Sequence, residues 1–386
     1  MSTNGSSAHG ATGPRFEVLI AGGGVAALEG LIALRALVGD RVSISLLAAD
    51  PEFVYRPLVV RAPFGMGAAE RYPLAEVAGH FGATLHADAF AWVDAQRRLA
   101  GTESGGRLRY DALLLALGAR PYPALKRVLT LDDRGLGEAF RGLVQDIEEG
   151  YARRVAFVAP PGPAWPLPLY ELALLTARRA FEMCVDVELS LVTPEDAPLA
   201  LFGQTASLAV EELLREAGVA VHTSSYPTLE DRSLILHPRG VRLDVERVVS
   251  LPLLVGPSVR GLPCARDGFI PVNPTGQVPG VQGVFAAGDA VDFPIKHGGL
   301  AAQQADVAAT SIAALAGVPV ERKRFRPVLR AMLLTGAEPR YLTAKISGGA
   351  GWSSTVSPTC PWSPPGKIAA EYLGRYLEER QPTAAR

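Results

Sequence analysis

The sequence predicts an α/β protein with two Rossmann-like domains in tandem and a small C-terminal α+β domain. Residues 16–22 (FEVLIAG) form a continuous apolar strand that ends in glycine, and VAALEGLIALRAL follows with apolar residues at helical spacing. The strand RVSISLLA (41–48) completes a βαβ unit of about thirty residues. The same order of elements recurs from residue 155, and a segment of different character closes the chain.

The repeat is visible in order and in spacing. VAFVAP (155–160) precedes the helical pattern LYELALLTARRAF, the strand VELSLVT (187–193) and the apolar run VVSLPLLVG (248–256), which matches YDALLLALGARP (110–121). The interval from Gly22 to Gly118 equals the interval from Pro160 to Gly256. The second fold therefore repeats the first, with Pro160 in the place of Gly22.

These elements divide the chain into three domains behind a polar tail at 1–14. We expect the first domain at 15–122 and 245–319, the second at 123–244, and the third at 320–386. A helix near 299–316 ends the first domain. In the third, RPVLRAMLLTGAEPRYLTAKI predicts a hairpin that turns at Thr335-Gly336, and PPGKIAAEYLGRYLEER predicts an amphipathic closing helix.

The composition excludes several classes of partner. The chain has 38 basic and 39 acidic residues, so no overall field favours nucleic acid. The tail lacks the apolar core of a signal peptide, and no apolar run reaches the roughly 18 residues that span a bilayer. We therefore expect a cytoplasmic protein whose membrane contact is at most peripheral, at the inner face.

The cysteines argue against a disulfide framework and against a metal site. Cys184, Cys264 and Cys360 are odd in number and lack CxxC spacing. We expect Cys184 in the core, because free cysteine is among the most buried residue types. Cys264 and Cys360 fall in loops, and redox chemistry by a non-adjacent pair stays open.

The first strand-to-helix turn, AGGGVAA, carries the G-x-G-x-x-G/A pattern of a dinucleotide site. Gly22 permits the tight turn, Gly24 lets the backbone approach a pyrophosphate, and Ala27 is small enough for helix and strand to touch. The alternative is a glycine-rich turn that binds nothing. An acidic ribose ligand is expected about 20 residues on, where Ala48 stands, so either Asp50 or Glu52 reaches back or the backbone holds the ribose.

A later segment, GVFAAGDAVDFPIKHGGLAAQQADVAA (283–309), resembles the second flavin-binding motif of the two-dinucleotide-fold flavoproteins. Together with AGGGVAALEG and YDALLLALGARP, it is similar to the sulfide:quinone reductase and type II NADH dehydrogenase branch of the pyridine nucleotide-disulfide oxidoreductase superfamily. The resemblance covers about 15–380 in layout. It implies FAD as cofactor, with Gly118, Gly288 and Asp289 in its site and the Asp289 carboxylate accepting hydrogen bonds from the ribityl chain.

The same resemblance places the N-terminus of the following helix at the flavin pyrimidine ring. Gly298, Gly299 and Leu300 open this helix, and its partial positive charge would stabilise negative charge on the reduced ring. Lys296 and His297 either add to that effect, as catalytic residues, or are solvated. Tyr55, Arg56 and Pro57, in PEFVYRPLVV, either line the isoalloxazine or form a packed surface loop.

The turn of the second fold, VAPPGPAWPLPLY, differs from the first. Pro160 and Pro161 lack the N–H groups that hold a pyrophosphate. Trp165, in the place of Ala27, is too large for close packing of helix on strand, while Pro168 suits the first turn of the helix. The turn resembles that of sulfide:quinone reductases, which keep the fold without binding NAD. NADPH held by Arg178 or Arg179 is the alternative.

The resemblance also bears on the donor. The family places one redox cysteine in this turn, where residues 155–174 have none, and another in the C-terminal domain, where Cys360 lies. We expect an FAD-dependent oxidoreductase, sulfide:quinone reductase-like, that passes two electrons from an unidentified small-molecule donor to a quinone-type acceptor. An NAD(P)H:acceptor oxidoreductase and a non-catalytic flavin-binding sensor are the alternatives, and a homodimer is left open.

Overall fold

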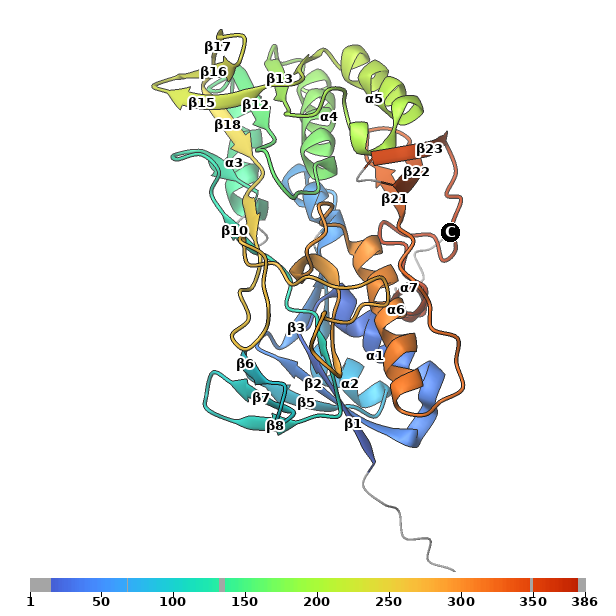
Figure 1. Ribbon diagram of the computed structural model, residues 1–386. Coiled ribbons are helices and arrows are strands. Elements are labelled where there is room, and N and C mark those ends of the chain that lie inside the picture. Colours follow the sequence, from blue (N-terminus) through green and yellow to red (C-terminus); the bar gives the residue numbers. More distant parts are fainter. Residues whose placement is uncertain (1–14, 68, 132–135, 348–349, 381–386) are drawn as a thin grey trace, which may run out of the picture.

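The computed structural model describes residues 15–67, 69–131, 136–347 and 350–380, and it contains two parallel sheets of five strands each (Figure 1). The first sheet has the order β20-β9-β1-β2-β5 and the second the order β11-β18-β12-β13-β14. The predicted fold class is therefore confirmed, while the predicted domain boundaries stay a prediction. In the first sheet the strands are β1 (Phe16–Ala21), β2 (Val42–Ala48), β5 (Thr84–Ala87), β9 (Ala112–Leu115) and β20 (Val284–Ala286). In the second they are β11 (Leu129–Thr130), β12 (Arg154–Val158), β13 (Glu188–Val192), β14 (Val219–His222) and β18 (Arg247–Ser250).

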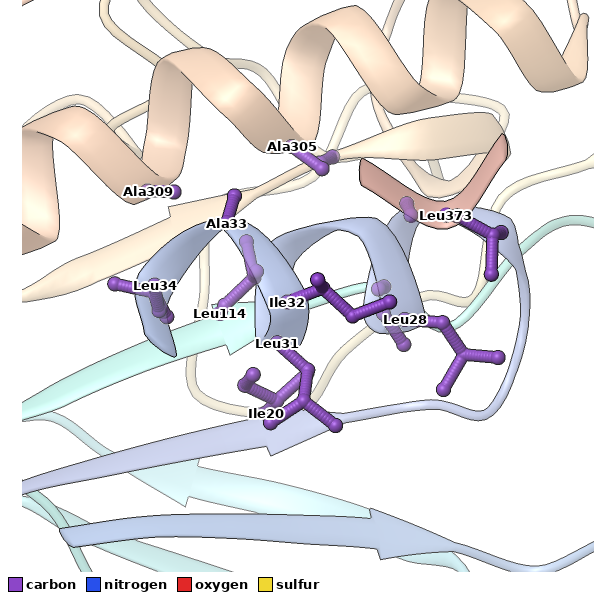
Figure 2. Close-up of a cluster of buried hydrophobic side chains, with 14 of the residues drawn as sticks. Ile20, Leu28, Leu31, Ile32, Ala33, Leu34, Leu114, Ala305, Ala309 and Leu373 are labelled. Atoms are coloured by element: carbon purple, nitrogen blue, oxygen red, sulfur yellow. The ribbon is translucent and has the colours of Figure 1, made fainter. Parts of the chain in front are cut away.

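Each sheet is covered by helices that pack on buried apolar strands. We call the first sheet with the helices that cover it the first lobe, and the second sheet with its helices the second lobe. In the first lobe, α1 (Val25–Val38) lies between β1 and α6 (Gly298–Leu315), as Figure 2 shows for Ile20, Leu31 and Ala305. Both helices carry alanines at this contact, and their small side chains let the two helices pack closely. The predicted helix near 299–316 is confirmed as α6. The other helices are α2 (Leu74–His80), α3 (Leu136–Glu148), α4 (Leu167–Glu182), α5 (Gln204–Glu216) and α7 (Tyr372–Glu378), with 3-10 turns η1 (Gly39–Arg41), η2 (Arg56–Phe64), η3 (Ala200–Phe202) and η4 (Gly288–Ala290).

Small antiparallel sheets complete both lobes and join them. Each lobe carries a three-stranded meander, and β10 pairs with β19 where the chain passes between the lobes. The apolar runs 110–121 and 248–256 were each expected to form one element. Each instead contains two strands: a buried strand of a parallel sheet, followed by a strand of the antiparallel pair between the lobes. These strands are β3 (Glu52–Tyr55) with β4 (Glu70–Pro73), β6 (Phe90–Asp94), β7 (Leu99–Thr102) and β8 (Arg107–Arg109), β10 (Arg120–Tyr122) with β19 (Leu253–Val255), and β15 (Tyr226–Glu230), β16 (Ser233–His237) and β17 (Val241–Asp244).

The C-terminal part forms a three-stranded sheet beside α5. Strands β21 (Val328–Leu333), β22 (Arg340–Ser347) and β23 (Ala350–Ser357) are antiparallel, and β23 packs on η3 and α5 (Figure 1). The predicted hairpin is confirmed. Its turn needs glycine, because Gly336 has φ +80° and a Cβ there would lie 2.7 Å from Arg178 Cβ.

The closing helix is shorter than predicted. Only Tyr372–Glu378 is helical, as α7, whereas the preceding segment is not. The reason is tertiary: the backbone N–H of Ile368 donates to the Tyr55 hydroxyl oxygen (3.1 Å), and the side chain of Lys367 is drawn to Glu171. Contacts with both lobes therefore hold 366–371 out of a helix.

Glu171 and Lys367 form a buried ion pair between α4 and the C-terminal segment. Lys367 Nζ lies 2.6 Å from Glu171 Oε2, and the two side chains are 6% and 0% exposed. The backbone N–H of Leu334 donates to Glu171 Oε1 (2.9 Å). Burial raises the pKa of Glu171 and lowers that of Lys367, and the mutual attraction opposes both shifts.

Lys367→Met should destabilise the protein strongly, because it leaves a buried carboxylate without its counter-ion. We expect a loss of about 3–5 kcal/mol in the free energy of unfolding, measured by urea denaturation. The double variant Glu171→Gln/Lys367→Met should recover most of it, since the amide oxygen still accepts from Leu334. Arg215→Met, which breaks an exposed pair with Glu212, should change stability far less, because water and salt screen the pair. A Lys367→Met protein as stable as wild type would contradict this account.

A second buried ionisable cluster lies where α1, α6 and α7 meet. The carboxylate of Glu29 accepts hydrogen bonds from the backbone N–H groups of Tyr372 and Leu373 and thus caps α7. Asp306 of α6 lies beside it, with Oδ1 buried and lacking a hydrogen-bond partner among the described residues. Burial, reinforced by the charge of Glu29, raises the pKa of Asp306 to about 8. Asp306 therefore holds a proton at neutral pH.

This proton makes stability depend on pH. An unfolded Asp releases its proton near pH 3.9, whereas folded Asp306 retains it to about pH 8, so its contribution to stability is complete below the unfolded pKa and is lost as pH rises from there to about 8. Asp306→Asn should remove this decline, which amounts to at most about 1.4 kcal/mol per pH unit. Urea unfolding of both proteins between pH 5 and pH 9 tests it, with the exposed Asp231→Asn as control. Parallel pH profiles for wild type and Asp306→Asn would be the opposite result.

Cys184 is exposed, not in the core, because it follows the C-terminus of α4 in a left-handed conformation (φ +53°). Within the described residues, none of the helices is both long and apolar enough to cross a bilayer.

Candidate functional site

The turn between β1 and α1 has the geometry of a dinucleotide turn. Gly22 has φ +126°, and a Cβ there would lie 2.1 Å from the carbonyl oxygen of Ala116. Its N–H donates to Leu47 O (2.8 Å). Only glycine can occupy this position, because the chain passes directly over the end of β9.

The N-terminus of α1 is open in front of this turn. Gly24 is its N-cap, makes no side-chain cap bond, and has nothing within 4 Å of the place where a Cβ would stand. The first N–H groups of a helix lack partners within it and carry a partial positive charge. Ala27 is fully buried beneath the turn. These features fit a pyrophosphate held by backbone donors.

The G-D pair lies against the same turn. A Cβ on Gly288 would lie 3.0 Å from the Cβ of Ala26, so the two motifs touch through small residues. The N–H of Gly288 donates to Gln304 Oε1 (2.8 Å), which fixes this turn to α6. Asp289 follows it, half-buried, in η4. The two sequence motifs, far apart in the chain, therefore form one site.

Lys296 is buried, and the carboxylate of Asp289 is among the charges that act on it. Its Nζ donates to the carbonyl oxygen of Val291 (2.6 Å) and lies 3.5 Å from the centroid of the Phe269 ring. Burial lowers the pKa of Lys296 to about 8, and the carboxylates of Asp289, Asp292 and Asp267 oppose this shift. Lys296 thus balances the charge of the Asp289 turn.

His297 is the N-cap of α6. Its Nδ1 accepts a hydrogen bond from the N–H of Leu300 (3.3 Å), so the ring proton is on Nε2. Burial lowers the pKa of His297 to about 3, so the ring is neutral at physiological pH. A Cβ on Gly299 would lie 2.8 Å from this ring, which explains the glycine. A Cβ on Gly298 would lie 3.0 Å from Cδ1 of Ile368 in the C-terminal segment, so the two residues lie close together.

The remaining expected residues lie around this centre. Tyr55 is buried against Ile368, and burial raises its pKa to about 12. Arg56 and Pro57 begin η2 directly after it. Asp50 is exposed in the bend after β2, and Gly118 turns the chain (φ +71°) after β9. Cys360 is half-buried and donates to Trp362 O (3.4 Å), with no other cysteine bonded to it.

The second turn shows that the expected register was wrong by one residue. Ala21 pairs with Leu47 and Val158 with Val192, so Ala159, not Pro160, corresponds to Gly22. Pro160 and Pro161 then take the places of Gly23 and Gly24. The count failed because the connections between corresponding strands differ in length.

Trp165 is also placed differently from the prediction. Helix α4 begins only at Leu167, so the connection over 159–166 is longer than Gly22–Gly24, and Trp165 lies in it. The Trp165 ring packs 4.3 Å from the His297 ring and 6.0 Å from the Phe202 ring, measured between centroids. Pro168 is in the first turn of α4, as predicted.

Glu195 is a residue that the sequence reasoning missed. It stands as far beyond Val192 as Asp50 stands beyond Leu47, at the place of a ribose-binding acid. Its Oε2 accepts hydrogen bonds from the Tyr170 hydroxyl (2.9 Å) and the Thr193 hydroxyl (3.2 Å), and its Oε1 is buried. Burial raises the pKa of Glu195. The repeat itself was the signal that could have located this residue.

Comparison with known proteins agrees with this architecture. Residues 171–311 match the family model described as pyridine nucleotide-disulphide oxidoreductase. The sulfide:quinone oxidoreductase of Aquifex aeolicus is 20% identical with a TM-score of 0.81, over 94% of this chain and 90% of that one. The chain has the fold of the pyridine nucleotide-disulphide oxidoreductases. The resemblance inferred from three motifs is confirmed.

Other solved structures share the fold less closely. A ferredoxin reductase from Rhodopseudomonas palustris is 20% identical with a TM-score of 0.66, over 86% of this chain and 83% of that one. An NAD-dependent persulfide reductase from A. fulgidus is 19% identical with a TM-score of 0.63, over 86% of this chain and 64% of that one. No curated protein matches the sequence. At these identities the comparisons show the shared fold.

Asp289→Ala should weaken the binding of FAD while leaving the fold intact. Hydrogen bonds to a charged group contribute roughly 1.5–3 kcal/mol, so we expect about 10- to 150-fold weaker binding. FAD titration of the apoprotein measures it, and thermal unfolding of the apoprotein checks the fold. The matched control is Asp292→Ala, since Asp292 is exposed and also acts on Lys296. Equal FAD affinity for Asp289→Ala and wild type would remove Asp289 from the site.

Proposed function

We propose that this protein is an FAD-dependent oxidoreductase that passes two electrons from a donor other than NAD(P)H to a quinone-type acceptor. The contrast between its two nucleotide turns carries the proposal. One turn offers glycines and open helix N–H groups, and the other offers prolines and a sequestered acid.

FAD would be held by the first lobe. The N-terminus of α1 and Gly24 would receive the pyrophosphate, and Asp289 the ribityl hydroxyls, with Gly22, Ala27 and Gly288 permitting the close approach. The flavin would supply the two-electron chemistry. The N-terminus of α6, at Gly298 and Gly299, would face its pyrimidine ring and favour the anionic reduced form. Asp50, Arg56, Pro57 and Leu300 complete the proposed surroundings.

NAD(P)H is disfavoured as donor for two independent reasons. Pro160 and Pro161 remove backbone donors from the turn that would face a second pyrophosphate. Glu195, the acid that would bind a ribose, already accepts hydrogen bonds from Tyr170 and Thr193. The fold alone does not decide this question, because an NAD-dependent persulfide reductase shares it.

A donor that reacts through a cysteine pair is also disfavoured. The connection over 159–166 has no cysteine, and Cys184 is exposed at the end of α4. Cys360 would have to act without a second cysteine from this connection. We therefore propose a sulfide:quinone reductase-like scaffold with a different donor. Cytoplasmic location, peripheral membrane contact and a homodimer remain predictions.

Anaerobic reduction of the purified holoprotein tests this proposal. NADH and NADPH should leave the visible flavin absorbance unchanged, whereas menadione, added after the flavin has been photoreduced, should accept its two electrons and restore the absorbance. Photoreduction of the same sample is the control that the flavin can be reduced. Fast, saturable bleaching by NADPH would instead support the NAD(P)H:acceptor alternative, and a protein that takes up no FAD would contradict the proposal altogether.

A further inference from the structure

The described chain ends in a segment, residues 369–380, that lies on α1 of the first lobe and that we call the strap. Leu373, Tyr376 and Leu377 of its helix α7 are buried in the same apolar core as α1, and Figure 2 shows Leu373 beside that helix. None of the described strands lies in the strap. A chain terminus without strand pairing opens at a lower free energy than a core element, so the strap can leave α1 while both sheets stay intact.

Two carboxyl groups lie beneath the N-terminus of α7. Glu29 of α1 is fully buried, and its carboxylate accepts hydrogen bonds from the backbone N–H groups of Tyr372 (3.0 Å) and Leu373. Asp306 of α6 lies close enough for the charge of Glu29 to act on it, and its Oδ1 is buried with no hydrogen-bond partner among the described residues. The group that holds the strap therefore shares its buried space with a second acid.

The surroundings of this pair supply little compensating charge. Lys323 favours ionisation of Asp306, whereas Glu371 opposes it, and the Tyr372 hydroxyl, the pKa of which burial raises, stays neutral. Burial and the charge of Glu29 raise the pKa of Asp306 to about 8. Loss of the proton places two negative charges side by side in a largely buried space, which is unfavourable. Because α1 and α6 belong to the packed core of the first lobe, α7 is the wall that can move to relieve this repulsion.

We propose that Glu29 and Asp306 form a proton-dependent latch: the strap is docked while the pair holds a proton, and it opens locally when the pair loses that proton. In the open state water reaches Asp306, which then ionises as an ordinary carboxylic acid. Opening therefore releases a proton, so it becomes more frequent as pH rises toward the pKa of the docked pair and levels off above it.

The latch goes beyond the proposed function and needs no bound flavin. It lies near the flavin site, however, because a Cβ on Gly299 would lie 3.5 Å from the carbonyl oxygen of Ala369, the first residue of the strap. The strap therefore begins at the N-terminus of α6, where opening would change access from solvent.

Hydrogen exchange of the full-length protein, followed by mass spectrometry of peptides that cover α7, tests the latch between pH 5.5 and pH 8. Comparison at each pH with Asp306→Asn, which cannot ionise, cancels the effect of pH on chemical exchange. Protection of α7 in wild type, relative to this variant, should fall by up to about tenfold per pH unit. Peptides that cover β12 should be more protected than α7 at every pH, because the strap opens without the sheet.

Two further variants complete the test. His80 of α2 also faces α7, with Nδ1 3.0 Å from the Tyr376 hydroxyl oxygen, so His80→Asn is the matched control and should keep the wild-type pH dependence. Glu29→Gln, whose amide oxygen still accepts from the N–H groups of α7, should weaken that dependence and serves if Asp306→Asn fails to fold. A relative protection of α7 that does not change with pH would overturn the latch. So would a pH dependence that His80→Asn abolishes, or exchange of α7 as slow as that of β12.

Discussion

The backbone bridge between Ala164 and Ile295 is the contact on which the rest of the site depends. It brings a loop of the second lobe onto the segment that caps α6, next to the Asp289 turn of the first lobe. The C-terminal segment reaches the same point through Ile368, which lies close to Gly298. Three parts of the chain therefore meet at one helix terminus.

The sequence predicted the parts of the site that local chemistry fixes. Gly22 must adopt φ +126°, and α6 opens with two glycines. Both features can be recognised in the sequence because they require glycine. The register of the second turn, the exposure of Cys184 and the short α7 were missed because they depend on contacts across the fold. The capping of α7 by Glu29, for example, joins residues more than three hundred positions apart, and no local pattern records it.

The repeat explains how two similar folds can have different chemistry. Parallel strands buried on both faces fix each sheet, and their pairing needs only apolar side chains. The turns contribute little to that burial, so their residues can change without loss of the fold. In the second lobe such change gave prolines, a longer connection and a Glu195 bound by Tyr170. The second turn therefore offers fewer backbone donors than the first.

The buried ionisable groups contribute to the position of the C-terminal segment more than to stability. Glu171–Lys367 and Glu29–Asp306 both lie where the C-terminal segment meets a lobe. Apolar residues of similar volume would hold these surfaces together at least as well, because desolvation offsets most of the attraction in a buried ion pair. Apolar contacts, however, tolerate sliding, whereas a buried charge must meet one particular partner. These groups therefore fix the position of the segment along the lobes, and so fix Ile368 against Gly298 at the N-terminus of α6.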